Sequence, residues 1–200
     1  AHVGIHEMTV TGKALTEAFY GEPPRYSYFS GCSTGGRQGL MEAQRYPADY
    51  DGIVSGAPAI NWPKLHVQQL WGPMLMNNES NPVAPCKLTA ATAAAIAACD
   101  TIDGVEDGVI EDPARCDYDA TALVGTSSAE CGTFTAADAS IVNRIWDGPR
   151  REDGSFLWHG AARGSDLNAL SGSRGEPLRP QAMFITLDWF RYFLTQDPEF

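Results

Sequence analysis

The sequence predicts an α/β fold in which a parallel sheet is covered by helices on both faces. Residues 1–60 alternate between helix-like and strand-like segments, and the strand-like segments are short and apolar. The chain has 200 residues, of which 44% are hydrophobic and 20% are charged, enough for one hydrophobic core of ordinary size. We therefore expect one domain, or part of one.

The first third of the chain predicts the order helix, strand, turn, helix, strand. Apolar residues recur at helical spacing over 5–19, and glycine and proline follow them. Residues 26–29 form a short aromatic strand that runs into a glycine-dense turn at 31–36. Residues 37–46 are good helix formers, and the sequence of residues 52–56 predicts a second buried strand. Alternation of this kind favours parallel strands.

Beyond Pro58 no further strand of comparable quality is predicted, so this part of the chain resembles an insertion. One helix ends at Cys99. A second follows Thr135, which is a suitable N-cap residue with Asp138 three positions later. Helical apolar spacing returns at 184–194.

Charge and hydropathy exclude two classes of partner. Acidic residues exceed basic ones to give a formal net charge of −11, and no cluster of lysine and arginine occurs. Such a field repels nucleic acid and anionic membranes. No apolar run reaches the roughly eighteen residues of a membrane helix. We expect a soluble protein that binds neither nucleic acid nor membrane.

Cysteine usage indicates an oxidising compartment. Five cysteines are many for a cytosolic chain of this size, and none forms a C-x-x-C pair. An odd number leaves one without a partner inside the chain, and the sequence begins without an initiator methionine. We expect a secreted or periplasmic protein, of which this chain is a fragment. The cysteines are Cys32, Cys86, Cys99, Cys116 and Cys131.

Residues 31–35 match the pattern G-x-S-x-G between a predicted strand and a predicted helix. A sharp turn in this position projects the serine hydroxyl, and the new helix offers free backbone N–H groups. We predict that Ser33 is a nucleophile and that the backbone N–H of Thr34 stabilises an oxyanion. The alternative is a glycine-rich turn that contains an ordinary serine.

Neither a thiol nucleophile nor a histidine base for such a site is predicted in this chain. Cys32 precedes the serine, where strand alternation points it away from the site, so a structural thiol or disulfide is favoured over a nucleophilic thiol. No histidine qualifies as the base, because two precede the serine and two lie in the insertion. We expect the base outside this chain. The histidines are His2, His6, His66 and His159.

An acidic loop at 99–116 predicts a calcium site. Carboxylates alternate with glycines in this loop, and such crowding is repulsive unless a cation is bound. The donors are hard oxygens without suitably spaced histidine or cysteine, which favours calcium over zinc. The spacing does not fit an EF-hand, and the alternative is a solvated acidic turn. The predicted ligands are Asp100, Asp103 and Asp107 with the carbonyls of Val105 and Val109.

Cys99 and Cys116 bracket this loop. A disulfide between them would constrain the unfolded state by about 3 kcal/mol and keep the ligands together. Metal and disulfide would then reinforce each other.

Taken together, these motifs resemble the tannase and feruloyl esterase family, which includes the mono-hydroxyethyl terephthalate hydrolase of plastic-degrading bacteria. The resemblance implies an α/β-hydrolase fold with a large calcium-binding lid. Residues 1–60 would be part of the hydrolase core with Ser33 as nucleophile, and 61–200 part of the lid with the calcium loop 99–116. The motifs are His6–Thr9 with Gly12-Lys13, Tyr28–Gly39, Asp51–Ala59, the acidic loop and Asp188–Phe193.

The family comparison also implies what lies elsewhere. The family joins the cysteine before the nucleophile to a cysteine that follows the catalytic histidine, so the partner of Cys32 is expected outside this chain, together with the catalytic aspartate and histidine. Relatives carry a small lid disulfide whose first cysteine is absent here, and by this comparison we predict that Cys86 pairs with Cys131.

The leading hypothesis is a secreted serine esterase that cleaves phenolic or aromatic acid esters of the feruloyl, galloyl or terephthaloyl type through an acyl-enzyme. The substrate would be a small aromatic ester derived from plant cell wall or tannin, and calcium would be structural. We expect the 200 residues alone to be inactive. The alternative is a non-catalytic, calcium-stabilised module that binds cell wall or carbohydrate, or a pseudoenzyme remnant.

Overall fold

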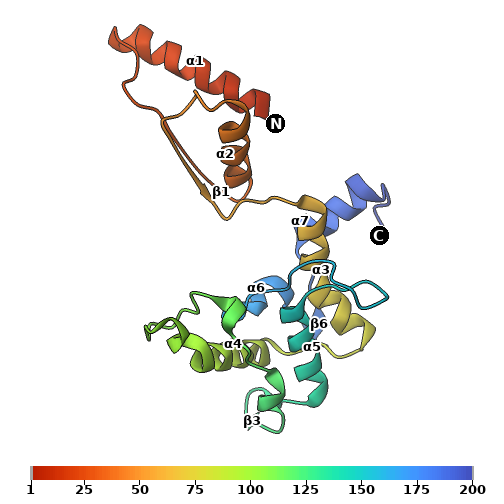
Figure 1. Cartoon of the computed structure of the whole chain (residues 1–200). Coiled ribbons are helices and arrows are strands. Elements are labelled where there is room, and N and C mark those ends of the chain that lie inside the picture. Colours follow the sequence, from red (N-terminus) through yellow and green to blue (C-terminus); the bar gives the residue numbers. More distant parts are fainter. Residues whose placement is uncertain (1, 200) are drawn as a thin grey trace. The chain divides into compact units, whose positions relative to one another are not determined.

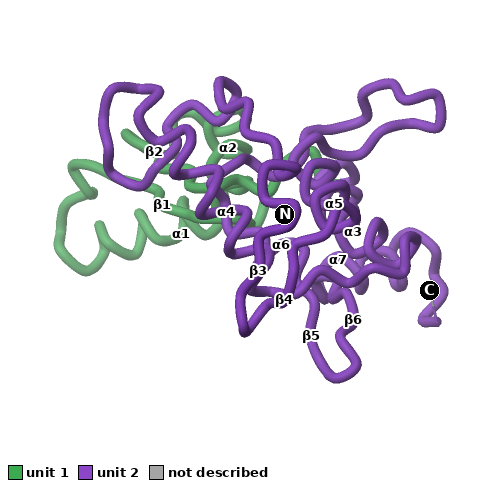
Figure 2. The backbone as a smooth tube through the Cα atoms, turned by 90° about the horizontal axis from the view of Figure 1, so that it is seen from below, with its two compact units in different colours: residues 1–62 green, residues 63–200 purple. Residues whose placement is uncertain are grey.

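The computed structural model describes residues 2–199 and divides the chain into two compact units, residues 1–62 and residues 63–200 (Figure 2). The sequence predicts a boundary between 60 and 61. The assignment of the two units as hydrolase core and lid stays a prediction.

Unit 1 has the predicted order of elements: helix α1 (His2–Tyr20), strand β1 (Tyr28–Cys32), helix α2 (Thr34–Arg45) and strand β2 (Gly52–Gly56). The two strands are parallel, with Tyr28 opposite Gly52 and Cys32 opposite Gly56. Parallel neighbours need a crossover connection, which α2 provides. β1 begins two residues later than predicted and α2 three residues earlier, so a single residue, Ser33, separates them.

Helix α2 covers one face of the β1–β2 pair and lies beside it in Figure 1. A β-carbon added at Gly39 would lie 3.0 Å from Ile53 and 3.1 Å from Phe29, so these side chains face the helix. On the opposite face Tyr28, Cys32 and Val54 are exposed. Within the described residues a helix therefore covers one face of the pair, and the predicted cover on both faces is not seen.

Helix α1 is held to the loop that follows α2. The Nδ1 atom of His6 lies 2.7 Å from a carboxylate oxygen of Asp49, and the His6 ring stacks on Tyr46 with centroids 4.0 Å apart. The Lys13 ammonium donates a hydrogen bond to the Asp49 carbonyl oxygen. These polar contacts attach α1 to unit 1, although many of its apolar side chains remain exposed.

Unit 2 consists mainly of helices, with α3 (Trp62–Asn78) continuing from the last residue of unit 1. The longer helices that follow are α4 (Pro85–Cys99) and α5 (Ala136–Asp147), and α7 (Phe184–Asp188) runs into a π-helical segment, Trp189–Leu194. The remaining elements are short. They are the 3-10 turns Asp100–Asp103, Pro113–Arg115 and Ala120–Leu123, helix α6 (Leu167–Ser171), and the strands β3 (Ser127–Ser128), β4 (Gly132–Thr133), β5 (Ser173–Arg174) and β6 (Arg179–Pro180).

Helix α3 is the longest element that was not predicted from the sequence. It contains Pro73, which removes a backbone donor and normally disfavours a helix interior. The helix forms because it buries a large side-chain surface, including Leu75 and Met76, in the core of unit 2. Burial in this core outweighs the local preference. The core residues are Leu75, Met76, Val83, Leu88, Ala91, Ala95, Ala120, Phe134, Ala139, Ile141, Val142, Ile145, Trp146, Ala161 and Leu167.

Helix α5 confirms the predicted start. The Thr135 hydroxyl accepts a hydrogen bond from the Asp138 backbone N–H at 3.1 Å, and the Asp138 carboxylate accepts one from the Thr135 backbone N–H at 2.8 Å. This reciprocal capping box satisfies two amide donors at the helix start. Asp138 is also buried, and its carboxylate lies 2.7 Å from the Lys87 ammonium of α4.

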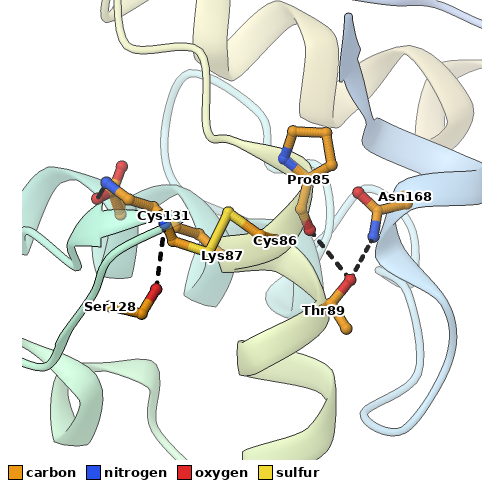
Figure 3. The surroundings of a disulfide bond; sticks show 8 residues. Pro85, Cys86, Lys87, Thr89, Ser128, Cys131 and Asn168 are labelled. Carbon is orange, nitrogen blue, oxygen red and sulfur yellow. Dashed lines mark hydrogen bonds and ion pairs between the residues drawn. A yellow bond between two sulfur atoms is a disulfide. The ribbon is translucent and has the colours of Figure 1, made fainter.

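Both predicted disulfides are present in unit 2. Cys86, in the first turn of α4, pairs with Cys131 beside the β3–β4 hairpin, with Cα atoms 5.9 Å apart (Figure 3). Cys99 pairs with Cys116, with Cα atoms 5.5 Å apart, and these two buried cysteines pack with Ile110 in a small second core. The acidic loop is thus closed covalently at its base.

No helix among the described residues combines the length and the apolar character that a membrane span needs.

Candidate active site

Ser33 lies alone between the end of β1 and the start of α2, and its side chain is exposed. Its backbone angles are φ 58° and ψ −113°, in the left-handed region that non-glycine residues avoid. A backbone of this kind costs about 1–3 kcal/mol and persists only where the surrounding structure holds it. The turn therefore has the sharp, strained geometry that projects a serine hydroxyl from a strand-to-helix junction.

Two glycines permit the close backbone contacts of this turn. A β-carbon at Gly31 would lie 2.6 Å from the carbonyl carbon of Gly35, and one at Gly36 would collide with the Gly56 carbonyl oxygen. No real side chain tolerates such contacts. Gly35 has open space at its β-carbon position, so the packing requirement falls on Gly31 and Gly36 and not on the last glycine of the G-x-S-x-G pattern.

The backbone of Ser33 is fixed on both sides. Its N–H donates to the Gly56 carbonyl oxygen at 3.0 Å, and its carbonyl oxygen accepts from the N–H groups of Ala59 at 3.0 Å and Arg37 at 3.1 Å. Thr34, which is exposed, is the first residue of α2 and therefore among the positions whose N–H groups have no acceptor within the helix. Its N–H is chemically suited to bind a developing oxyanion.

Cys32 is exposed on the outer face of the strand pair, in line with Tyr28 and Ser30. Because side chains alternate along a strand, the Cys32 side chain points away from the face that α2 covers. Within the part of the chain that the structure describes, Cys32 forms no disulfide.

The four histidines have local partners of their own. His6 pairs with Asp49, and that hydrogen bond raises the pKa of His6. His2 Nδ1 lies 3.2 Å from the Tyr46 hydroxyl. The buried ring of His66 hydrogen-bonds to Thr186 at 2.9 Å and stacks on Trp189, and burial lowers its pKa. Within the described part of unit 1, His2 and His6 are hydrogen-bonded to Tyr46 and Asp49 and not to Ser33.

His159 lies against the rings of Phe156 and Trp158, with centroids 5.1 and 5.3 Å away. The expectation that the catalytic base lies outside this chain stays a prediction.

The acidic loop has the bends that sequence analysis expected. Gly104 and Gly108 have φ angles of 94° and 82°, which favour glycine. The Asp100 carboxylate accepts hydrogen bonds from the Gly108 N–H at 3.0 Å and from the Asp107 N–H at 3.3 Å. The loop therefore folds back on the Asp100 side chain.

The other predicted ligands lie at the surface of this loop. Asp103 accepts from the Val105 N–H at 2.8 Å and Asp107 from the Val109 N–H at 3.1 Å, and both valines are more than half exposed. Among the described residues, no group of three or more acidic, histidine or cysteine side chains is arranged to hold a metal ion. The hard oxygen donors are of the type that calcium takes, and the predicted set, which also includes two backbone carbonyls, stays a prediction.

Glu42 of α2 is a titratable residue that sequence analysis passed over. It is fully buried, and within the described residues neither carboxylate oxygen has a hydrogen-bond partner. Burial raises its pKa, and the nearby negative charge of Asp49 adds to this shift. Nothing in the sequence signalled this burial, because a glutamate is normally exposed unless it is paired.

The comparison with protein families decides what this arrangement belongs to. A sequence model described as "Tannase and feruloyl esterase" matches residues 1–176. The chain belongs to the tannase and feruloyl esterase family. The family likeness predicted from the Ser33 turn, the acidic loop and the flanking motifs is thereby confirmed.

Individual relatives of this family member are similar over nearly all of its length. It is 42% identical over 202 residues to a probable feruloyl esterase of Arthroderma benhamiae, and 35% identical over 206 residues to the probable feruloyl esterase B-2 of Aspergillus oryzae. Each match covers 98% of this chain and 37% of the relative. The chain thus spans little more than a third of the length of these proteins.

Solved structures of the family share its fold. The crystal structure of feruloyl esterase B from Aspergillus oryzae matches with a TM-score of 0.77 and 33% identity, over 98% of this chain and 39% of that one. The tannin acyl hydrolase from Aspergillus niger matches with a TM-score of 0.83 and 25% identity, over 96% of this chain and 38% of that one.

Proposed function

We propose that the protein containing this chain is a secreted serine carboxylic-ester hydrolase that acts on esters of phenolic or aromatic acids. The observation that carries this proposal is the geometry of Ser33. Its exposed hydroxyl stands on a left-handed residue between a parallel strand and a helix, where hydrogen bonds from two other segments hold the strained backbone. An ordinary loop serine needs no such support.

In the proposed reaction the Ser33 hydroxyl loses its proton to a histidine base, which we place outside residues 1–200. The Oγ atom then bonds to the ester carbonyl carbon, and the Thr34 N–H at the start of α2 stabilises the oxyanion. Collapse of this intermediate breaks the bond to the alcohol, which leaves with the proton. Water then attacks the acyl-enzyme, releases the aromatic acid and restores the Ser33 hydroxyl.

The substrate class and the location are inferred from relatives and from covalent structure. Relatives named feruloyl esterase and tannin acyl hydrolase support aromatic acids of plant cell wall or tannin origin as the acyl group. Two disulfides among the described residues favour an oxidising, extracellular setting.

Turnover by the full-length protein tests this proposal directly. Methyl ferulate, methyl gallate and a nitrophenyl ester are the substrates, and we expect Ser33→Ala to lower kcat by at least about 10³-fold. Ser30→Ala is the matched control, because Ser30 is also exposed but lies within β1. Hydrolysis that survives Ser33→Ala, or ligand binding without turnover, would instead support the non-catalytic module.

We also propose that the acidic loop binds calcium in a structural role. Oxygen donors of the type that calcium prefers share one loop, which the Cys99–Cys116 disulfide closes. The loop belongs to unit 2, whereas Ser33 belongs to unit 1, and no step of the reaction depends on the ion.

A chelator distinguishes a structural ion from a catalytic one. We expect EDTA to lower the Tm of the full-length protein, calcium to restore it, and Asp103→Asn to reduce that calcium-dependent gain. Asp117→Asn, just outside the loop, is the control. Loss of turnover without any change in Tm would contradict a structural role, and a Tm indifferent to both reagents would contradict calcium binding.

A further inference from the structure

Residues Gly56–Trp62, which we call the exit segment, lead out of β2 and pass directly across the first turn of α2. A β-carbon at Gly36 would collide with the Gly56 carbonyl oxygen and would lie 2.9 Å from the Cα atom of Pro58. The exit segment and the helix that follows Ser33 are therefore in backbone contact.

The exit segment also binds the backbone of Ser33 itself. Gly56 accepts the hydrogen bond from the Ser33 N–H, and Ala59 donates one to the Ser33 carbonyl oxygen, each at 3.0 Å. Both backbone polar groups of Ser33 thus depend on where this segment lies. If the segment moved, the left-handed conformation of Ser33 would lose the contacts that hold it.

The exit segment is strained in its own right. Ala57 has a φ of 37° and Asn61 a φ of 50°, so two of its seven residues are non-glycine residues in the left-handed region. A segment in this state relaxes unless contacts secure it at both ends. Strand β2 secures the first end, through the pairing of Gly56 with Cys32.

A contact between Arg37 and Trp62 secures the second end. The Arg37 guanidinium carbon lies 4.7 Å from the centre of the Trp62 ring, within the range of a cation–π contact. Arg37 belongs to the first turn of α2, and its N–H donates to the Ser33 carbonyl oxygen at 3.1 Å. The contacts therefore form a closed circuit. Ser33 is bonded to the first turn of α2, Arg37 of this turn contacts Trp62, and the exit segment that ends at Trp62 is bonded to Ser33.

We propose that Arg37 and Trp62 are positioning residues for Ser33, because their stacking holds the exit segment against α2 and so maintains the backbone conformation that projects the hydroxyl. The inference rests on the proposed function of Ser33 as nucleophile. Weakening the stack lets the hydroxyl leave its reactive position for part of the time. The rate of attack by Ser33 falls, whereas substrate affinity changes little.

The conservative variant Arg37→Lys tests this inference in the full-length protein. Lysine keeps the positive charge near the turn but lacks the planar group that stacks on an indole. We expect kcat for methyl ferulate to fall about tenfold, since small misplacements of reacting atoms have effects of this size or larger, with KM changed by less than about twofold. Reaction of Ser33 with phenylmethylsulfonyl fluoride, which forms a sulfonyl ester and releases fluoride, should slow by a similar factor.

Arg25→Lys is the matched control. Arg25 also lies over an aromatic ring in unit 1, with its guanidinium carbon 5.4 Å from the centre of the Tyr26 ring, but it precedes β1 and belongs neither to the Ser33 turn nor to α2. We expect its kcat and its labelling rate to equal those of the wild type.

Variants at Trp62 examine the other half of the stack. Trp62→Phe keeps a ring and should retain more activity than Trp62→Leu, and Arg37→Lys combined with Trp62→Leu should be no slower than the slower single variant. Far-UV circular dichroism and Tm show whether each variant is folded at the assay temperature.

The outcomes separate the two proposals. Wild-type labelling and kcat in both Arg37→Lys and Trp62→Leu would overturn the positioning role alone. Activity that falls only in proportion to the unfolded fraction would assign the pair to stability and overturn it as well. A wild-type protein that is inactive and unlabelled at Ser33 would overturn the proposed function and this inference with it.

Discussion

Ser33 and Glu42 lie nine positions apart on one strand–turn–helix unit, yet their surroundings are opposite. Ser33 is exposed and strained in its backbone, whereas Glu42 is helical and buried without a hydrogen-bond partner among the described residues. Each is an arrangement that stability alone does not favour. For Glu42 the consequence is a dependence of stability on pH.

Because burial raises the pKa of Glu42, the folded state binds its proton more tightly than the unfolded state does. The contribution of Glu42 to stability is therefore fully present below its ordinary pKa of 4.5 and is lost as pH rises through the raised value. We expect Glu42→Gln, which cannot ionise, to match the wild-type Tm near pH 4 and to exceed it at pH 7 to 8. Calorimetry of the full-length protein across this range measures the difference.

Glu17→Gln is the control for this prediction, because Glu17 is an exposed carboxylate on α1. It should leave the pH profile of Tm unchanged. A Glu42→Gln variant whose Tm runs parallel to the wild type at all pH values would show that Glu42 is hydrated and ionises normally.

At the scale of single elements, the first turn of α5 contains a buried charge, Asp138. The sequence predicted Asp138 only as part of a helix cap. Asp138 completes the capping box and also accepts from Lys87 and Asn81. Burial by itself would raise the pKa of Asp138, but the hydrogen bonds from Lys87, Thr135 and Asn81 outweigh burial and lower it. One carboxylate thus joins α4, α5 and the segment that precedes α4.

We expect Asp138→Asn to lower the free energy of unfolding by about 3 kcal/mol at pH 7, since it leaves the Lys87 ammonium without its charged partner. The stabilising contribution of Asp138 is present above its ordinary pKa of 3.8 and is lost as pH falls through the lowered value. Urea unfolding should therefore show a large difference in unfolding free energy between the wild type and Asp138→Asn at pH 7. This difference should be smaller at about pH 2.

Asp147→Asn provides a control on the same helix. Asp147 pairs with Arg150, and both side chains are more than a third exposed, so solvent screens the interaction. We expect a loss below about 1 kcal/mol. If Asp138→Asn and Asp147→Asn lowered the free energy of unfolding equally, the importance of burial would be refuted.

At the scale of the whole molecule, covalent links are unequally distributed between the units. Both disulfides of the described residues lie in unit 2, whereas unit 1 contains Cys32 beside Ser33 on an exposed strand face. An exposed thiol is readily oxidised in a compartment where the other cysteines are paired. We expect Cys32 to pair with a cysteine outside residues 1–200.

Peptide mapping of the full-length protein without reduction measures this pairing. The expected result is Cys86 with Cys131, Cys99 with Cys116, and Cys32 with a cysteine that lies beyond this chain. Recovery of Cys32 as a free thiol, or joined to one of the other four, would contradict the prediction.

The parts of the fold and of the candidate site that could be predicted from the sequence are those that depend on near neighbours in the chain. The turn at Ser33, the left-handed glycines of the acidic loop and the cap at Thr135 each involve residues within about ten positions of one another. Helix α3 was missed because Pro73 is locally unfavourable and only the core of unit 2 compensates for it.

The sequence by itself therefore determined the strand–turn–helix that presents Ser33, the glycine bends of the acidic loop and, through motif resemblance, the family to which the chain belongs. Only the tertiary structure decided that Glu42 is buried and that the exit segment binds Ser33 and closes on Arg37. Local conformation follows from the steric and hydrogen-bonding preferences of adjacent residues, whereas these contacts arise from the packing of separate elements, which no local preference encodes.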